Sequence, residues 1–171
     1  MTDMKLKASR TDKATFVKAY GHIYEHSPWV AEFVWHENDP QTLDTLEGLA
    51  SGMAAIVDQA NEAAKMKLIC AHPDLAGKAA QRDELTTESK SEQSGAGLDQ
   101  CNAEEFEEFQ RLNSAYKTKF GFPFIIAVKG LDRQAILAAF RSRLNNDREH
   151  EFYTAINQIH KIARLRLSEL A

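Results

Sequence analysis

His72 lies where a predicted helix is interrupted, and histidine is the side chain best suited to proton transfer near neutral pH. A purely helical scaffold would not need such an interruption. An apolar stretch of helical periodicity leads into His72, and Pro73 follows it. Proline disfavours helical backbone at the residue before it, so the helix is expected to end there and to present the imidazole at a defined angle. Histidine titrates near neutral pH, which suits general acid–base catalysis. The alternative is a histidine that bonds the last carbonyls of the helix.

Residues 89–97 combine polar side chains with glycine. Ser89 and Glu92 match the spacing of a helix capping box, in which both side chains bond otherwise unpaired amides. A cap does not explain Gln93 followed by Gly95 and Gly97. Glycine lets the backbone approach a small ligand closely, and neighbouring amide donors can hold anionic groups. Both a cap and a ligand-binding loop are therefore open.

Residues 120–128 alternate aromatic residues with glycine and proline and then run into four apolar residues. The plainest interpretation is a buried connection in the core. A buried non-helical segment must still satisfy its N–H and C=O groups. A ligand rich in amides could satisfy some of them.

Arg166 is the one charged residue on the apolar face of the last predicted helix. Positions 152, 155, 159, 162, 166 and 170 share that face, and the other members are apolar. A buried guanidinium needs an anionic partner or several acceptors, which an internal carboxylate or a bound one could supply. Arg164 instead falls on the polar face of the same helix, with Tyr153, Asn157, His160 and Lys161.

His22, Glu25 and His26 fit the H-x-x-E-H pattern of some zinc hydrolases, with two histidines one helical turn apart. Pro28 would break that helix two residues later, and no third ligand is evident. The pattern therefore favours two surface histidines over a metal site.

Composition bounds the class of protein. The 171 residues fit one domain, 1–171, that can bury a core without metal or disulfide support. The net charge of -4 comes from interspersed signs, which predicts no nucleic-acid partner. Cys70 and Cys101 are too few for a disulfide framework or a zinc cluster. No signal peptide and no membrane-spanning run is evident, so a cytoplasmic location and no membrane partner are expected.

Helical periodicity covers most of the chain. Thr11-Asp12, Asn102 and Asp132 are candidate helix caps. Only residues 124–128 are strand-like, and a single such run cannot build a sheet. The sequence thus predicts an all-α, single compact multi-helix domain with no sheet. Its helices are expected at about 11–26, 29–39, 42–57, 63–71, 102–120, 132–140 and 147–170, with at least one loop within 86–100.

Five segments taken together resemble one enzyme family. They span nearly the whole chain, in order, and their joint occurrence is far more specific than any one of them. The family is the 2-oxo-4-hydroxy-4-carboxy-5-ureidoimidazoline (OHCU) decarboxylases of uric acid breakdown. The segments are Tyr24–Ala31, His72–Gly77, Ser89–Leu98, Phe120–Ile125 and Lys161–Leu167.

The resemblance implies a cofactor-free, all-α and usually homodimeric carbon–carbon lyase. Such an enzyme releases CO2 from its small-molecule ureidoimidazoline substrate to give (S)-allantoin, without a metal. His72 matches the catalytic histidine of the family and Glu92 its partner carboxylate. The matching substrate-binding positions are Pro73, Ser89, Lys90, Ser91, Glu92, Gln93, Phe124, Ile125, Ile126, Ala127, Val128 and Arg166.

Two readings from other classes stay open at this point. The first is a non-catalytic helical module that binds a ureido compound without converting it. The second is a small zinc hydrolase built on His22, Glu25 and His26. A binder would leave the decay of the substrate unchanged or slow it, and a zinc hydrolase would carry stoichiometric metal.

Overall fold

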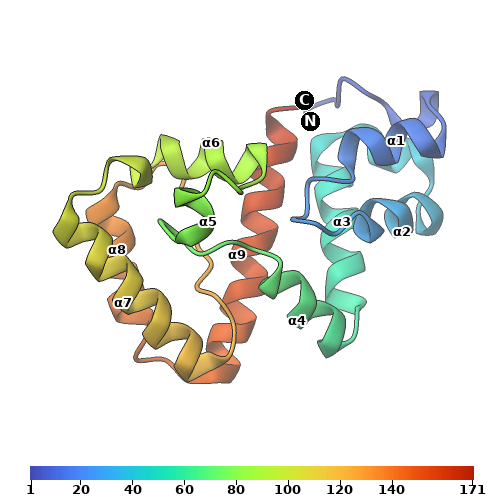
Figure 1. Cartoon of the computed structure of the whole chain (residues 1–171). Coiled ribbons are helices and arrows are strands. Elements are labelled where there is room, and N and C mark those ends of the chain that lie inside the picture. The colour runs from blue at the N-terminus through green and yellow to red at the C-terminus, as the bar shows by residue number, and fades with distance from the viewer. The chain divides into compact units, whose positions relative to one another are not determined.

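The computed structural model describes residues 1–171 as helices joined by turns and non-helical segments (Figure 1). The single β feature is an isolated bridge between Asp3 and Thr45, so the predicted all-α fold without a sheet is confirmed. None of the helices has the length and apolarity needed to cross a bilayer. The helices are η1 (Ala8–Arg10), α1 (Lys13–Tyr20), α2 (Trp29–Glu37), η2 (Pro40–Asp44), α3 (Leu46–Gln59), α4 (Glu62–Cys70), α5 (Lys78–Gln81), α6 (Thr87–Gly95), η3 (Leu98–Gln100), α7 (Ala103–Phe120), α8 (Arg133–Arg143) and α9 (Arg148–Ser168), where η marks 3-10 helices.

The chain divides into two compact units. Unit 1 comprises residues 1–71 and 159–171, and unit 2 comprises residues 72–158. Helix α9 contributes its first half to unit 2 and its second half to unit 1. The prediction that residues 1–171 act as one domain stays a prediction.

The predicted helix caps are confirmed where a short polar side chain precedes an amphipathic run. Asp12 caps α1 and Asp132 caps α8, each by accepting a hydrogen bond from a backbone N–H three residues later. Asn102 and Glu105 form a complete capping box at the start of α7. Gly121 ends that helix with a positive φ of 79°, a conformation that costs glycine little.

The prediction that the first helix continues through residues 22–26 is wrong. Helix α1 ends at Tyr20, and residues 21–27 form turns. Gly21 is a weak helix former, and Pro28 restricts the residue before it, so neither end of this short stretch favours helix. His26 adopts a positive φ of 48°, which lies outside the right-handed helical region.

The helix expected from Thr42 begins later. Pro40–Asp44 forms a 3-10 turn, and Thr45 caps α3 by accepting from the N–H of Gly48. The apolar spacing predicted the buried face correctly, because Leu49, Met53 and Val57 are all buried. Apolar periodicity does not mark the boundary between a 3-10 turn and the helix that follows.

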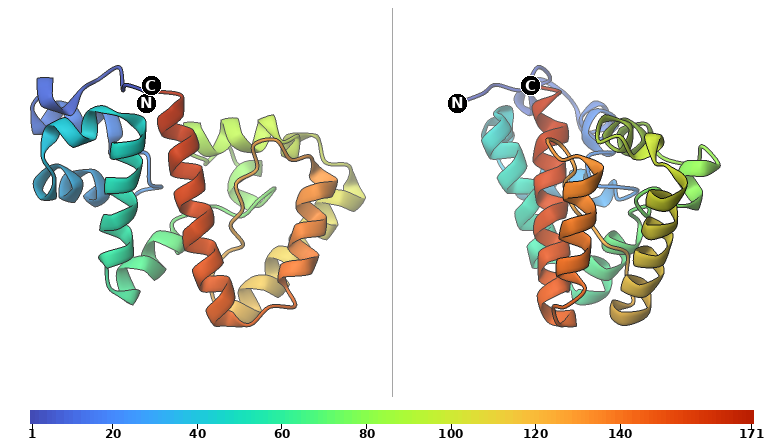
Figure 2. Two further views of the ribbon diagram at one scale, coloured as in Figure 1. Left: turned by 180° about the vertical axis from the view of Figure 1, so that it is seen from behind. Right: turned by 90° about the vertical axis from the view of Figure 1, so that its left-hand side faces the viewer.

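Unit 1 is built on packing between α1, α2 and α3 (Figure 2). Phe16 of α1 contacts the rings of Tyr20 and Trp35, both at 5.0 Å between centroids. Val34 of α2 and Leu49 of α3 are fully buried in the core of this unit. Ile23 and Tyr24, in the turns at residues 21–27, are also buried.

Unit 2 has an aromatic core centred on Tyr116 of α7. Its ring lies within 4.5–5.9 Å, centroid to centroid, of four phenylalanine rings. They come from the end of α7, from the following non-helical segment and from α8, which packs against α7. The predicted burial of residues 120–128 is therefore largely confirmed. The four rings are Phe120, Phe122, Phe124 and Phe140.

Buried tyrosines should make the protein less stable above pH 10. The hydroxyl of Tyr20 donates to the carbonyl of Leu6 at 2.6 Å, and burial, with a smaller effect of Asp44, raises the pKa of Tyr20 to about 12. An unfolded tyrosine ionises near pH 10, so this contribution is complete below pH 10 and is lost as the pH rises toward 12. The variant Tyr20→Phe should show a shallower loss over that window. Urea midpoints from pH 9 to 12 test this, and equal slopes for both proteins would contradict it.

Candidate active site

His72 lies immediately beyond the end of helix α4. The helix ends at Cys70, Ala71 is its C-cap, and His72 begins a non-helical loop that runs to Gly77. This confirms the helix end that Pro73 predicts. The His72 residue is 9% exposed, so its ring is held in the protein rather than free in solvent.

Side-chain amides hold the main chain of this loop. Gln93 uses both ends of its amide, because its Oε1 accepts from the N–H of Ala76 at 3.0 Å and its Nε2 donates to the carbonyl of Asp74 at 3.2 Å. Asn113 of α7 donates to the carbonyl of Leu75 at 2.9 Å. Ala76 has a positive φ of 49°, an uncommon conformation for a residue with a Cβ. The loop that starts at His72 is therefore fixed against α6 and α7.

Helix α6 presents the predicted polar residues on two different faces. Ser89 and Gln93 are buried, Glu92 is half-buried, and the spacing places all three on one face. Lys90 and Ser91 are exposed on another. The cap of α6 is not Ser89, because the side chain of Thr86 accepts from the N–H of Ser89.

The capping-box alternative for Ser89 and Glu92 is therefore wrong. Both residues lie inside α6, and the loop expected within 86–100 is confined to short segments around that helix. Gln93 adjoins Glu92 and holds the loop that begins at His72. This contact brings the helix carrying the predicted carboxylate to the loop carrying the predicted catalytic histidine.

Residues 124–128 form an extended, buried segment whose main chain is bonded by side chains. The carbonyl of Ile125 accepts from Nη1 of Arg143 at 2.6 Å, and the N–H of Ala127 donates to Oε1 of Gln158 at 2.9 Å. Phe124 and Val128 are buried at either end, whereas Ile126 is only half-buried. Two main-chain groups of this strand-like run therefore have side-chain partners, although no neighbouring strand is present.

Arg166 lies in unit 1 and is buried, as its place on the apolar face of α9 predicts. Its Nη2 lies 2.9 Å from Oε2 of Glu25, which is 2% exposed, and its Nη1 donates to the carbonyl of Ile23 at 3.3 Å. The internal carboxylate that the sequence left open is therefore Glu25. Arg164 is 52% exposed and lies 3.7 Å from Glu47.

The zinc pattern does not form a helical metal site. His22, Glu25 and His26 lie in turns, and Glu25 pairs with Arg166. The structure holds no group of three or more histidine, cysteine, aspartate or glutamate side chains arranged to bind a metal ion.

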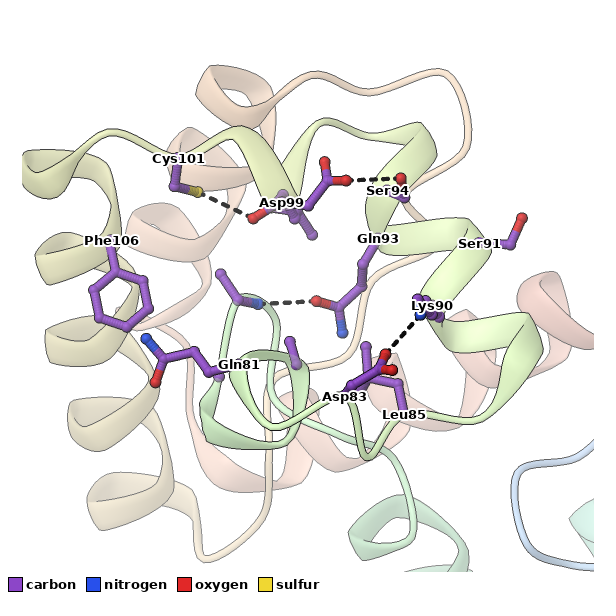
Figure 3. Close-up of a pocket in the computed structure, with 14 residues that line it drawn as sticks. Gln81, Asp83, Leu85, Lys90, Ser91, Gln93, Ser94, Asp99, Cys101 and Phe106 are labelled. Carbon is purple, nitrogen blue, oxygen red and sulfur yellow. Dashed lines mark hydrogen bonds and ion pairs between the residues drawn. The ribbon is translucent and has the colours of Figure 1, made fainter.

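Unit 2 also contains a cavity of about 560 Å³ beside α6, shown in Figure 3. Lys90, Ser91 and Gln93 line it, but His72 and Glu92 do not. Lys90 pairs with Asp83 at 2.6 Å, so its charge is already matched. From α6 the cavity is therefore lined by Lys90, Ser91 and Gln93, but not by Glu92.

His72, Pro73, residues 89–93 and residues 124–128 belong to unit 2, and Arg166 belongs to unit 1. Gln93 connects the loop of His72 and Pro73 to helix α6 through its bonds to residues 74 and 76. That Arg166 acts on the same substrate as His72 stays a prediction.

Comparison with known proteins identifies the family. The sequence model described as OHCU decarboxylase matches residues 9–168. The chain belongs to the OHCU decarboxylase family. It is 44% identical over 162 residues to the 2-oxo-4-hydroxy-4-carboxy-5-ureidoimidazoline decarboxylase of Halalkalicoccus jeotgali, covering 95% of this chain and 88% of that protein.

Two solved structures related to the OHCU decarboxylase family have the same fold. The crystal structure of (S)-allantoin synthase matches with a TM-score of 0.78 and 34% identity over 99% of this chain. The chain spans about half the length of that protein, since the match covers 53% of it. The crystal structure of OHCU decarboxylase in the presence of (S)-allantoin matches with a TM-score of 0.65 and 25% identity, covering 83% of this chain and 89% of that one.

Sequence reasoning missed the residues of this OHCU decarboxylase family member that hold the loops. Asn113 follows Leu112 on the buried face of α7, and it is 4% exposed. A polar residue on an otherwise apolar helical face was the available signal. The same signal singled out Arg166 on α9.

Removing the amide of Asn113 should loosen the His72 loop. The variant Asn113→Ala leaves the carbonyl of Leu75 without its donor, which costs about 1–3 kcal/mol of folding free energy. We expect a lower unfolding midpoint and a several-fold lower kcat/KM. The control is Ser114→Ala, because Ser114 is an exposed neighbour on α7. An Asn113→Ala protein with unchanged stability and activity would show that the loop does not depend on this bond.

Proposed function

We propose that this protein decarboxylates OHCU to (S)-allantoin and CO2 in uric acid degradation. Membership of the OHCU decarboxylase family supports the reaction class, a carboxy-lyase. The contact that carries the proposal within the chain is Gln93, which joins the loop of His72 to the helix of Glu92. A histidine and a carboxylate held on adjoining segments are suited to moving one proton at a defined place.

The chemistry of the substrate indicates what the side chains must do. The ring carbon that bears the carboxylate adjoins an imine carbon. The C=N group can therefore accept the electron pair of the C–C bond that breaks. As the bond to the carboxylate breaks, CO2 leaves and the electron pair moves onto the adjacent C=N unit. The imine nitrogen takes up a proton, a proton also adds to the former imine carbon, and the neighbouring hydroxyl loses its proton as it becomes the carbonyl of allantoin, so that one proton is consumed overall. The protein must orient the carboxylate out of the ring plane and deliver the proton to one face.

His72 is the acid–base group in this proposal. Glu92 orients the imidazole or accepts from ring or ureido nitrogens. Both polar ends of Gln93 bond the loop, so its part is to position His72, in addition to the predicted contact with substrate. In this proposal the main chain at Ile126, a half-buried residue, bonds the amide groups of the substrate.

Lys90 and Ser91 complete the predicted binding segment from α6. Their side chains line the cavity together with Asp83, which pairs with Lys90. The homodimer and the cytoplasmic location are proposals of the same kind. The homodimer rests on the family resemblance, and the cytoplasmic location carries over the expectation from the sequence.

Replacing His72 should abolish catalysis without unfolding the protein. The variant His72→Asn keeps a polar side chain of similar size but cannot exchange a proton near neutral pH. The loss should be about 10²–10⁴-fold in turnover, the usual contribution of a positioned acid or base. Substrate is generated from urate by urate oxidase, and circular dichroism follows the appearance of one allantoin enantiomer. His150→Asn is the matched control because His150 is exposed at the start of α9.

The same assay separates the proposed enzyme from its alternatives. A binding module would leave the decay of the intermediate unchanged or slow it, and it would give racemic product. A zinc hydrolase would lose activity with a chelator. Wild-type turnover in His72→Asn would show that the proton is moved by another group.

Arg166 should contribute to substrate binding in a way that Arg164 does not. The variant Arg166→Lys keeps a positive charge beside Glu25 but loses the planar pair of donors. If Arg166 also binds the substrate, KM should rise roughly ten- to a hundredfold, in keeping with about 1.5–3 kcal/mol for a charged hydrogen bond. Arg164→Lys should match the wild type because Arg164 is half exposed. A folded Arg166→Lys protein with unchanged KM would confine Arg166 to its ion pair.

A further inference from the structure

The extended segment 124–128 depends on a side chain that no part of the proposed mechanism uses. Nη1 of Arg143 donates to the carbonyl of Ile125 at 2.6 Å, and its guanidinium carbon lies 4.3 Å from the centre of the Phe124 ring. We propose that Arg143 is a positioning residue of the active site, which sets the main-chain geometry that residues 124–128 offer to the substrate. This inference rests on the proposed function, because that function places the substrate against this segment.

A buried carboxylate fixes the guanidinium. Nε of Arg143 donates to Oε1 of Glu151 at 2.8 Å, and the Glu151 side chain is completely buried. The hydroxyl of Tyr116 donates to the same oxygen at 2.6 Å, and Nδ2 of Asn146 donates to the other oxygen at 3.0 Å. Burial and the neighbouring Glu151 raise the pKa of Tyr116, so its hydroxyl keeps the proton it donates. Two donors besides Arg143, from Tyr116 and Asn146, thus hold the carboxylate that in turn holds the guanidinium.

The guanidinium restrains one peptide from two directions. Its edge bonds the carbonyl of Ile125, and its face covers the ring of Phe124. That ring is itself stacked on Phe140 of α8, with 3.9 Å between centroids and 10° between planes. The peptide therefore cannot rotate without breaking a charge-assisted hydrogen bond or displacing a packed ring.

A second restraint acts two residues further on. The N–H of Ala127 donates to Gln158, so the chain is held on both sides of Ile126. Ile126 is the least buried residue of the segment, and its main chain carries no restraint of its own. The two bonds set the direction of the Ile126 peptide groups, which the proposed function turns toward the substrate. Nη2 of Arg143 is buried without a hydrogen-bond partner.

Lysine cannot reproduce these contacts. It carries one compact charge on a flexible stem, whereas arginine offers separate donors in a rigid plane and a face that stacks on a ring. The variant Arg143→Lys keeps a cation for Glu151 and so avoids a lone buried carboxylate. It loses the simultaneous bond to Ile125 and the contact with Phe124.

The matched control lies two residues away on the same helix. Arg141 also pairs with a glutamate of this unit, with its Nε 2.6 Å from Oε1 of Glu108, but its side chain is 51% exposed. Arg141→Lys therefore changes the same residue type and an ion pair without touching residues 124–128. It should leave kcat/KM and ligand affinity at the wild-type level.

Kinetics and product binding are then compared in protein shown to be folded by circular dichroism. Arg143→Lys should lower kcat/KM by about ten- to a hundredfold, because small misplacement of binding groups has effects of this size. Calorimetric titration with (S)-allantoin should show weaker binding, which a merely stabilising ion pair would not cause. Wild-type kcat/KM and wild-type allantoin affinity in folded Arg143→Lys would overturn the inference.

A second variant applies if Arg143→Lys does not fold. Arg143→Met combined with Glu151→Gln removes both charges, and the glutamine can still bond Tyr116. The same two measurements on this protein, with the same expected losses, decide the question. Failure of the proposed function is distinguishable, since in that case the wild-type protein itself would not accelerate formation of (S)-allantoin.

Discussion

Two buried guanidinium groups, one in each unit, bridge a glutamate and a main-chain carbonyl outside the helices. Arg166 joins Glu25 and the carbonyl of Ile23, and Arg143 joins Glu151 and the carbonyl of Ile125. Removing one partner of such a buried pair typically costs about 3–5 kcal/mol, because the remaining charge is left without compensation. The non-helical segments at Ile23 and Ile125 are therefore stabilised by the buried ion pairs to which their carbonyls are bonded.

This arrangement follows from building an active site in a protein without a sheet. Non-helical main chain that is buried has to be hydrogen-bonded, and no neighbouring strand is present to do so. Side chains from the helices take over: Gln93 and Asn113 bond the loop after His72, and Gln158 bonds Ala127. Because a helix side chain has few rotamers once it is packed, such bonds fix the loop to the rigid part of the fold.

Much of the scaffold was predictable from local sequence. The caps at Asp12, Asn102 and Asp132 and the buried face around Arg166 depend on residues close together in the chain, and the structure confirms them. The errors arose where local signals compete. Thr86 rather than Ser89 caps α6, since both are hydroxyl residues three positions apart and only the structure shows which one begins the helix.

The site could be predicted only in part, because some of its contacts join separate segments of the chain. His72, Glu92 and residues 124–128 carry sequence patterns, so a resemblance can find them. The bonds from Gln93 to residue 76 and from Arg143 to residue 125 join segments far apart in the chain, and no local pattern encodes them. An arginine near the polar end of a helix, as Arg143 is in α8, looks like an ordinary solvated charge until its glutamate is placed.

The amide of Gln93 has a consequence for which residue types its position can accept. One end must accept a hydrogen bond from Ala76 and the other must donate one to Asp74. A glutamate of the same length and shape would direct a negative oxygen at the Asp74 carbonyl, and a methionine would leave both backbone groups unmatched. An acidic residue at position 93 would therefore lose the bond to Asp74. For this reason Glu92 has no second carboxylate directly beside it in this turn of α6.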